Sequence, residues 1–151
     1  MPKRKDTKLE SEGAEFLVLG HLLIEGVHCY KAYINFPGYD LHAVNPSTGR
    51  VARIQVKSRW ATDYDKSFPI RNFDCDFVVH VALNRGNSFS KRATKINPAP
   101  PEFYVLPIEE VKKVQEMKIS FGKVRLSKIP KVKLESYKGN WRLVREFLET
   151  K

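Results

Sequence analysis

The sequence predicts a mixed α/β domain built on a central sheet, and three observations favour this fold class. An apolar pattern of helical period occupies the first part of the chain. A hairpin of alternating residues follows it, and a continuous apolar run comes after the hairpin. Helices and strands that succeed one another in this way are typical of a sheet covered by helices. With 151 residues the chain suits one domain with a substantial core.

The first element is an expected helix that begins at Thr7 and ends near Gly26. Thr7 and Glu10 have the spacing of a capping box, in which two side chains satisfy amide groups at a helix start. Apolar residues and glycines then recur at helical spacing on more than one side, so we expect a helix that is buried over much of its surface. Residues 1–6 precede it and are expected to be disordered. The residues with helical spacing are Leu9, Gly13, Phe16, Leu17, Gly20, Leu23 and Ile24.

Five segments have the pattern of strands. Residues 27–36, 39–45 and 50–58 alternate apolar and polar side chains. Residues 75–83 form a continuous apolar run, which is typical of a strand buried on both faces. Residues 102–107 form a further short strand, so the predicted sheet has strands enough to support helices on its faces.

Helices are expected again in the last third of the chain. One begins near Pro107 and runs to about Met117, and a closing helix has Asn140 as its N-terminal cap. Residues 119–138 are basic, and we expect them to be partly extended. Residues 84–101 form a long loop that is rich in turn residues and positive charge, and long loops in compact domains tend to be functional or disordered.

The charge and the cysteine content indicate which binding partners and which cellular compartment to expect. Lys and Arg number 27 against 17 acidic residues, and the resulting charge of +10 attracts polyanions such as nucleic acids. A merely basic, soluble domain is the alternative. Cys29 and Cys75 provide neither a disulfide framework nor a zinc-site spacing, so a reducing, cytoplasmic setting is expected. The apolar stretch 16–24 is shorter than the ~20 residues that span a bilayer, so no membrane partner is expected.

The predicted hairpin brings polar residues of two strands together. If the turn Pro-Ser-Thr-Gly pairs Asn45 with Arg50, the apolar pattern fixes the register of the whole hairpin. One face is then apolar and suits contact with the first helix. On the other face Asp40 lies opposite Gln55, with the roots of facing side chains about 5 Å apart, and Lys57 follows two residues later.

These three side chains suit phosphoryl chemistry. Asp40 offers an anionic oxygen to Mg²⁺, Gln55 offers a neutral oxygen, and the carbonyl of Val56 offers another. Lys57 would orient or deprotonate the attacking water, or stabilise charge on the phosphorus oxygens. The alternative is a solvated face, because polar residues lie opposite the apolar face of any half-exposed hairpin.

The segments "PGYD" and "IQVK" resemble the core of the PD-(D/E)xK nuclease superfamily, in its variant with glutamine at the third acidic position. "GAEFLVLGHLLIEG" resembles the first helix of that family, and "DFVVHVAL" and "EFYVLP" resemble its later strands. The resemblance implies a restriction-endonuclease-like fold and a DNA endonuclease that depends on Mg²⁺ or Mn²⁺, like some compact homing endonucleases. It also implies that Glu15 completes a metal site made by Asp40, Gln55 and Val56, with Lys57 assisting the attacking water.

Alternatives stay open at two of these positions. Glu15 would instead form an ion pair with a lysine, and Glu12 on the same turn is a second candidate ligand. Gln55 carries no negative charge, which weakens a metal shell, so an inactive DNA-binding protein of the same fold is a second hypothesis. A nuclease of the Holliday junction resolvase type is another within the fold, and a basic RNA-binding module is one outside it.

Six basic residues are predicted to contact DNA. They flank the proposed site on its own strand or lie in the long loop, and each phosphate contact would release counterions and steepen the salt dependence of binding. For any one of them a solvated surface charge is the alternative. Cutting both strands of a duplex requires two sites, so a homodimer or larger homo-oligomer is expected. The six residues are Arg53, Arg59, Arg85, Lys91, Arg92 and Lys95.

Overall fold

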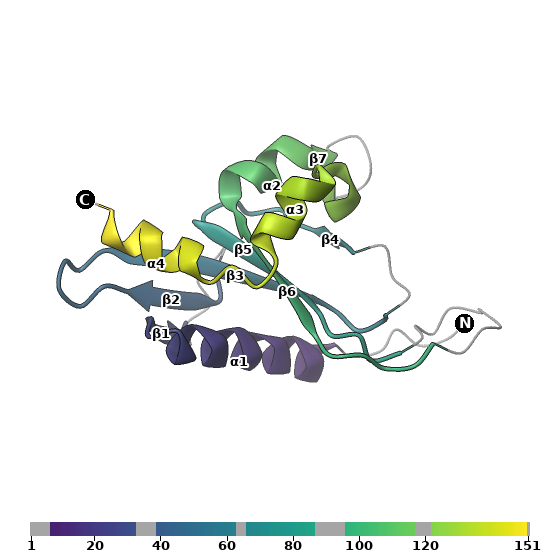
Figure 1. The fold of residues 1–151 in the computed structure, drawn as a ribbon, viewed down its shortest axis with the longest axis horizontal. Coiled ribbons are helices and arrows are strands. Elements are labelled where there is room, and N and C mark those ends of the chain that lie inside the picture. Colours follow the sequence, from purple (N-terminus) through teal and green to yellow (C-terminus); the bar gives the residue numbers. More distant parts are fainter. Residues whose placement is uncertain (1–6, 33–38, 63–65, 87–95, 117–121, 151) are drawn as a thin grey trace.

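A mixed sheet of five strands runs through the centre of the computed structural model (Figure 1). The structure describes residues 7–32, 39–62, 66–86, 96–116 and 122–150. The predicted disorder of residues 1–6, the end of the strand predicted at 27–36 and most of the loop predicted at 84–101 lie outside these ranges. No helix in the described ranges has the length and apolar content needed to cross a membrane.

The strands of the central sheet are β1 (His28–Lys31), β2 (Leu41–Val44), β3 (Val51–Arg59), β5 (Phe77–Ala82) and β6 (Glu102–Pro107). They lie in the order β1–β2–β3–β5–β6. β3 and β5 are parallel, and the other neighbours are antiparallel. Every residue of β5 is buried, as its continuous apolar sequence predicted. Because a parallel pair needs a crossover connection, the chain leaves this sheet between β3 and β5.

The hairpin of β2 and β3 has the predicted register over the length of β2. Leu41 pairs with Ile54, and at the turn the amide of Asn45 donates to the carbonyl of Arg50 over 2.9 Å. Gly49 closes the turn with a φ of 74°, in the left-handed region that favours glycine. The register is strongly determined, because a slip of one residue would move every apolar side chain of the hairpin to the opposite face.

Helix α1 (Lys8–Ile24) lies along one face of the sheet (Figure 1). Its buried side chains, Ala14, Val18 and Leu22, share an apolar core with the apolar face of the hairpin. The closing helix α4 (Arg142–Glu149) contributes to the same core. The prediction that the apolar face of the hairpin packs against the first helix is therefore confirmed.

Two predictions about α1 are wrong. The side of the helix that faces away from the sheet is not buried, since Leu9 is 89% exposed and Ile24 is 82% exposed. Thr7 is the N-cap residue, but its side chain makes no capping hydrogen bond, so the capping box with Glu10 does not form. Gly26 follows the end of the helix with a φ of 81°, and its predicted role as a stop is confirmed.

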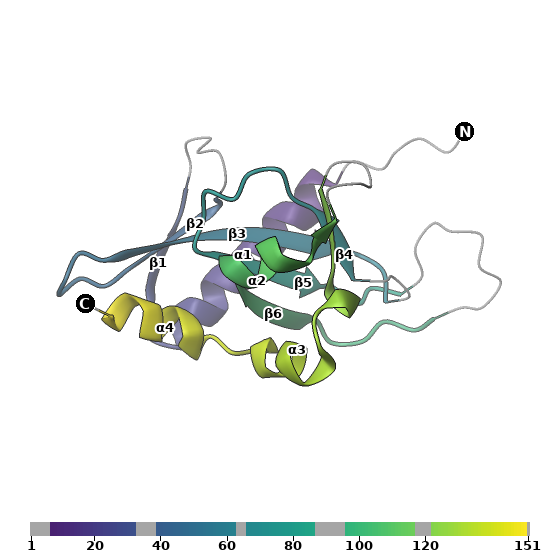
Figure 2. The same ribbon diagram turned by 90° about the horizontal axis from the view of Figure 1, so that it is seen from above.

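Short elements cover the opposite face of the central sheet (Figure 2). A second apolar core lies between them and the sheet. A small antiparallel sheet in the order β4–β8–β7 contributes to it. The sequence did not predict this sheet, because strands of two or three residues are too short to show a period. The elements of this layer are β4 (Ser67–Pro69), α2 (Ile108–Val114), β7 (Gln115–Glu116), β8 (Lys123–Arg125), the 3₁₀ helix η1 (Leu126–Lys128) and α3 (Lys131–Tyr137).

The ends of two predicted helices differ from the structure. α2 ends at Val114, before the predicted end near Met117, because Gln115 is already extended and pairs with β8. The N-cap of α4 is Trp141 in place of the predicted Asn140. The side chain of Asn140 instead donates a hydrogen bond of 2.9 Å to the carbonyl of Ser136.

Candidate active site

Asp40 lies where the ladder between β2 and β3 ends. Its amide donates to the carbonyl of Ile54 over 2.8 Å, and its carbonyl accepts from the amide of Ala32 over 2.9 Å. Its carboxylate accepts a hydrogen bond of 2.7 Å from the amide of Val56. The predicted pairing of Asp40 with Gln55 is therefore wrong by one residue, because the chain shifts against β3 at this point and aims the carboxylate at Val56.

Glu15 on α1 reaches toward Asp40. Burial, the charge of Asp40 and a hydrogen bond to the Asp40 side chain raise the pKa of Glu15 to about 7. A hydrogen bond between two carboxyl groups requires a proton on one of them, so the pair holds one proton at or below neutral pH. The structure thus brings two of the predicted metal ligands together from different elements.

Lys31 of β1 supplies a cation beside this pair. Its Nζ lies 3.1 Å from a carboxylate oxygen of Glu15 and also forms an ion pair with Glu12. The ion pair of Glu15 with a lysine, an alternative in the sequence analysis, is therefore present. The ammonium favours the ionised form of Glu15 and opposes the effect of Asp40. Nothing in the sequence singled out Lys31, because no short spacing relates a strand residue to a side chain of the preceding helix.

Gln55 and Lys57 lie on the face of β3 that points away from α1. They are level with Val78 and His80 of β5, and Val78 belongs to the core beneath α2 and α3. Burial lowers the pKa of Lys57, while the carboxylate of Asp40 acts in the opposite direction. Asp40 therefore interacts with Glu15 on one side of β3 and with Lys57 on the other.

The oxygen donors at this point suit a hard divalent cation. Oε1 of Gln55 is buried and has no hydrogen-bond partner in the described part of the chain, a state that costs free energy until a cation or a donor binds. A divalent ion would also relieve the repulsion between the carboxylates of Glu15 and Asp40. Among residues 7–32, 39–62, 66–86, 96–116 and 122–150, no three His, Cys, Asp or Glu side chains gather closely enough to hold a metal. A site here therefore needs the amide oxygen as a third donor.

A cavity of about 280 Å³ opens beside Lys57, and we call it the β3 cleft. Lys57 and Arg59 line it from the end of β3, Glu10 and Ser11 line it from the first turn of α1, and β4 closes a further side. Ser11 lies one turn before Glu15 on the same side of α1. The cleft therefore lies next to the carboxylate pair and carries two basic side chains.

The residues predicted to contact DNA lie in different surroundings. Arg53 forms ion pairs with Asp74 and Asp76. Arg59 lines the β3 cleft. Arg85 is exposed. The remaining three, Lys91, Arg92 and Lys95, lie outside the described residues.

His80 is a buried polar residue that the sequence analysis did not single out. It is fully buried, and neither ring nitrogen has a hydrogen-bond partner within the described ranges. Its ring lies between those of Phe68 and Tyr104, at centroid distances of 5.5 Å and 6.4 Å. Burial lowers the pKa of His80 to about 3, so the ring is neutral at pH 7. Its position in a continuous apolar run is typical of a core residue, and it pairs with Lys57 on the neighbouring strand β3.

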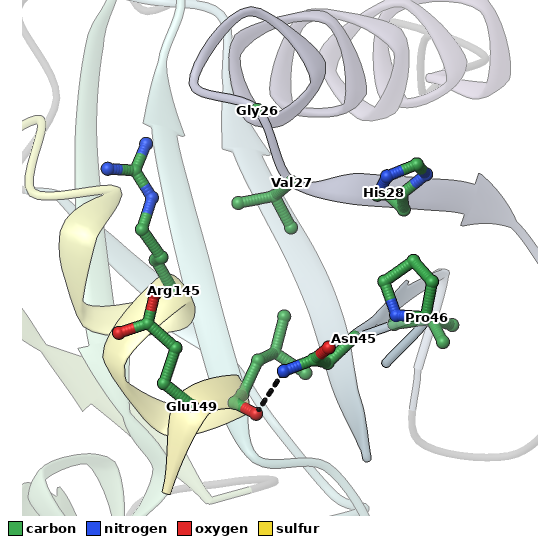
Figure 3. Close-up of a pocket in the computed structure, with 9 residues that line it drawn as sticks. Gly26, Val27, His28, Asn45, Pro46, Arg145 and Glu149 are labelled. Carbon is green, nitrogen blue, oxygen red and sulfur yellow. Dashed lines mark hydrogen bonds between the residues drawn. The ribbon is translucent and has the colours of Figure 1, made fainter. Parts of the chain in front are cut away.

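A smaller cavity of about 180 Å³ lies between the end of α1, the hairpin turn and α4 (Figure 3). Its side chains include Arg145, Glu149 and Asn45, and Nδ2 of Asn45 donates to the carbonyl of Leu148 over 3.0 Å. None of the residues predicted to hold a metal or to act in catalysis lines this cavity. The β3 cleft is therefore the better candidate for an active site.

Comparison with known proteins identifies a fold. No protein-family model matches the sequence, and no curated protein matches it. Among solved structures, the chain is similar to the bacterial homing endonuclease I-Ssp6803I, with a TM-score of 0.57 and 22% identity over 95% of this chain and 94% of that chain. It is also similar to Hjc, a Holliday junction resolvase from the archaeal hyperthermophile Archaeoglobus fulgidus, with a TM-score of 0.46 and 18% identity over 78% of this chain and 85% of that chain. The first likeness and the five-stranded mixed sheet confirm the predicted restriction-endonuclease-like α/β fold.

Proposed function

We propose that the protein is a DNA endonuclease that depends on a divalent metal and hydrolyses phosphodiester bonds at the β3 cleft. The observation that carries the proposal is the pair of carboxyl groups, Glu15 and Asp40, which meet where the amide of Val56 binds Asp40. Gln55 precedes Val56 in β3 and adds a buried, unpartnered amide oxygen. The fold shared with a homing endonuclease supports this class of activity. The net charge of +10 supports a polyanionic substrate.

In the proposed site, Glu15, Asp40, Gln55 and the carbonyl of Val56 hold Mg²⁺ or Mn²⁺. When bound, such an ion supplies an activated water at neutral pH and stabilises charge on the phosphoryl oxygens. The proton between Glu15 and Asp40 must leave before both carboxylates can act as ligands, so metal binding is coupled to pH. The amide of Val56 fixes the carboxylate of Asp40 in place for this role.

Lys57 is the proposed partner of the attacking water. Its lowered pKa makes transfer of a proton to or from Nζ easier than at an exposed lysine, and in its charged form it stabilises an anionic phosphate. Arg59 lines the same cleft and is a candidate phosphate contact. The two basic side chains would therefore hold the substrate in the β3 cleft, beside the first turn of α1.

A second candidate function is DNA binding without turnover. Gln55 replaces a carboxylate in the donor set, and the described residues offer no third acidic ligand. Fewer negative charges weaken Mg²⁺ binding. The half-buried Lys57 argues for turnover, because removing a cation from water costs free energy that a purely structural residue would not need to bear.

The two candidates are distinguished by cleavage of supercoiled plasmid and of branched DNA, each with Mg²⁺, with Mn²⁺ and with chelator. Asp40→Asn keeps an acceptor for the amide of Val56, and Lys57→Met keeps much of the side-chain volume, so both variants should fold. Lys113→Met, at an exposed site on α2, is the matched control. We expect metal-dependent cutting that only the control retains. DNA binding without cutting on every substrate would favour the second candidate, and a preference for branched DNA would indicate a resolvase type.

A further inference from the structure

α1 carries a second apolar stripe on the side that faces away from the sheet. Its buried stripe consists of Ala14, Val18 and Leu22. At 3.6 residues per turn, the second stripe fills a sector of about 120° on the opposite side of the helix. It contains Leu9 (89% exposed), Gly13, Phe16 (52%), Leu17 (40%), Gly20, Leu23 (51%) and Ile24 (82%).

Such a stripe is unusual for a helix in contact with water. A helix on the surface of a globular protein normally carries polar residues opposite its core face. Here the exposed apolar residues continue over the whole helix, a length of about 24 Å at 1.5 Å per residue. Contiguous exposed apolar patches mark interaction sites, so this stripe needs a partner.

The stripe is symmetric about its centre, which lies between Phe16 and Leu17. Six of the seven stripe residues form pairs at equal distances from this point that match in kind, and Leu23, whose equivalent position is Glu10, is the exception. A two-fold axis through this point would therefore superpose most of the stripe on itself. An isologous interface between two copies of one chain requires this property, whereas a foreign partner does not. The matching residues are Gly13 with Gly20, and Leu9 with Ile24.

The glycines and the charges fit the same arrangement. A Cβ atom built at Gly13 or at Gly20 would meet nothing within 4 Å, so the backbone is open to a second helix at both points. The distance between packed helices depends on the side chains at the contact, and glycines allow the closest approach. In the two-fold arrangement, the Lys8 end of each helix lies beside the Glu25 end of the other. The partial charges of the two helix dipoles are then opposite in sign at both ends of the pair.

Phe16, at the centre of the stripe, is held in place within its own chain. The ammonium of Lys31 lies 4.4 Å from the centre of its ring. Ordering an exposed side chain before association lowers the entropy cost of binding. The side chain of Phe16 is thus already ordered in the single chain, before a second copy binds.

We propose that α1 pairs antiparallel with α1 of a second copy of this chain, forming a homodimer about a two-fold axis near Phe16 and Leu17. The proposed dimer depends only on the exposed apolar stripe of α1 and does not require nuclease activity. Glu15 lies outside the sector of the stripe, so the pairing leaves the carboxyl pair accessible. A dimer of this kind would carry two β3 clefts.

The oligomeric state is tested by sedimentation velocity across a concentration series, without DNA. Leu23→Glu places a charge in the stripe, and Gly13→Leu inserts a side chain that the single chain has room for and that favours a helix. We expect wild type to dimerise and each variant to raise the dissociation constant about tenfold or more. Val132→Glu is the matched control, because Val132 is an exposed apolar residue on α3 (87% exposed). It should dimerise like wild type.

The antiparallel register has its own test. Leu9 and Ile24 lie about 22 Å apart along one helix, so a disulfide between these positions must join two copies. Under mild oxidation, a mixture of Leu9→Cys and Ile24→Cys chains should form a covalent dimer, and Leu9→Cys alone should not. The native Cys29 and Cys75 are buried and should not interfere. A monomeric wild type, unchanged dimerisation of both stripe variants, or equal cross-linking by Leu9→Cys alone would each overturn the proposal.

Discussion

At the scale of single residues, the proton between Glu15 and Asp40 predicts how metal binding depends on pH. The pKa of Glu15 is raised from 4.5 to about 7, and a bound metal must displace this proton. We therefore expect Mn²⁺ to raise the melting temperature of the protein more above pH 7 than below it. In Glu15→Gln this dependence on pH should disappear. Equal stabilisation by Mn²⁺ on both sides of pH 7 in the wild type would contradict the shared proton.

Without metal, the raised pKa of Glu15 should make the folded protein less stable as the pH rises. Because the pKa of Glu15 is higher in the folded than in the unfolded chain, the folded chain binds this proton more tightly. The contribution of Glu15 to the free energy of unfolding should then decrease as the pH rises from about 4.5 through about 7. Comparing wild type with Glu15→Gln in urea, with chelator present, isolates this contribution from the effect of metal.

The approach of Glu15 to Asp40 was expected from the sequence, whereas the backbone geometry that holds Asp40 was not. Asp40 and Gln55 belong to strands whose apolar pattern could be read, but the shift at Asp40 depends on backbone hydrogen bonds to Ala32 and Ile54 at the end of a ladder. The ion pair of Glu15 with Lys31 joins a helix to a strand. No local spacing encodes such contacts, because they arise only when the layers assemble.

At the scale of elements, the β2–β3 hairpin fixes the position of α4. Nε of Arg50 donates to the carbonyl of Phe147 over 2.7 Å, and its guanidinium lies 4.4 Å from the centre of the Phe147 ring. A cation at the C-terminus of a helix also interacts favourably with the helix dipole. The hairpin turn therefore caps the closing helix, and loss of this contact should loosen α4 on the sheet.

We expect Arg50→Ala to lower the free energy of unfolding by about 1.5–3 kcal/mol, the usual range for a hydrogen bond to a charged group. Arg142→Ala is the matched control. Its ion pair with Glu146 is exposed and lies within α4, and a solvent-screened pair of this kind contributes little to stability. Urea denaturation of both variants measures the difference. Similar losses in the two variants would show that the hairpin does not anchor α4.

Predictability also differed among elements. The hairpin and β5 could be predicted, because alternation and a continuous apolar run each determine which faces are buried. The small sheet of β4, β7 and β8 could not, because its strands are too short to carry a period. The outer side of α1 was expected to be buried because its sequence is apolar. That side is exposed in the described part of the chain, which is the observation behind the proposed dimer.

At the scale of the whole molecule, the candidate site depends on both layers of the fold. α1 carries Glu15 on one face of the sheet, and β3 presents Lys57 to the other face. Asp40 interacts with both, at the end of the hairpin ladder. Unfolding of either layer should therefore disable the site.

The net charge of +10 predicts that binding to duplex DNA weakens with salt, with a slope set by the number of phosphates contacted. Arg85 is exposed, and its amide donates to the carbonyl of Trp60 just beyond β3, so it lies at the same end of the sheet as the β3 cleft. Arg142 belongs to α4, the helix that lies toward the opposite end (Figure 1). In plots of log affinity against log salt concentration, Arg85→Ala should reduce the slope by about 0.9, the loss of one phosphate contact. Arg142→Ala should leave the slope unchanged. If the two variants change it equally, the DNA does not lie along the cleft end of the sheet.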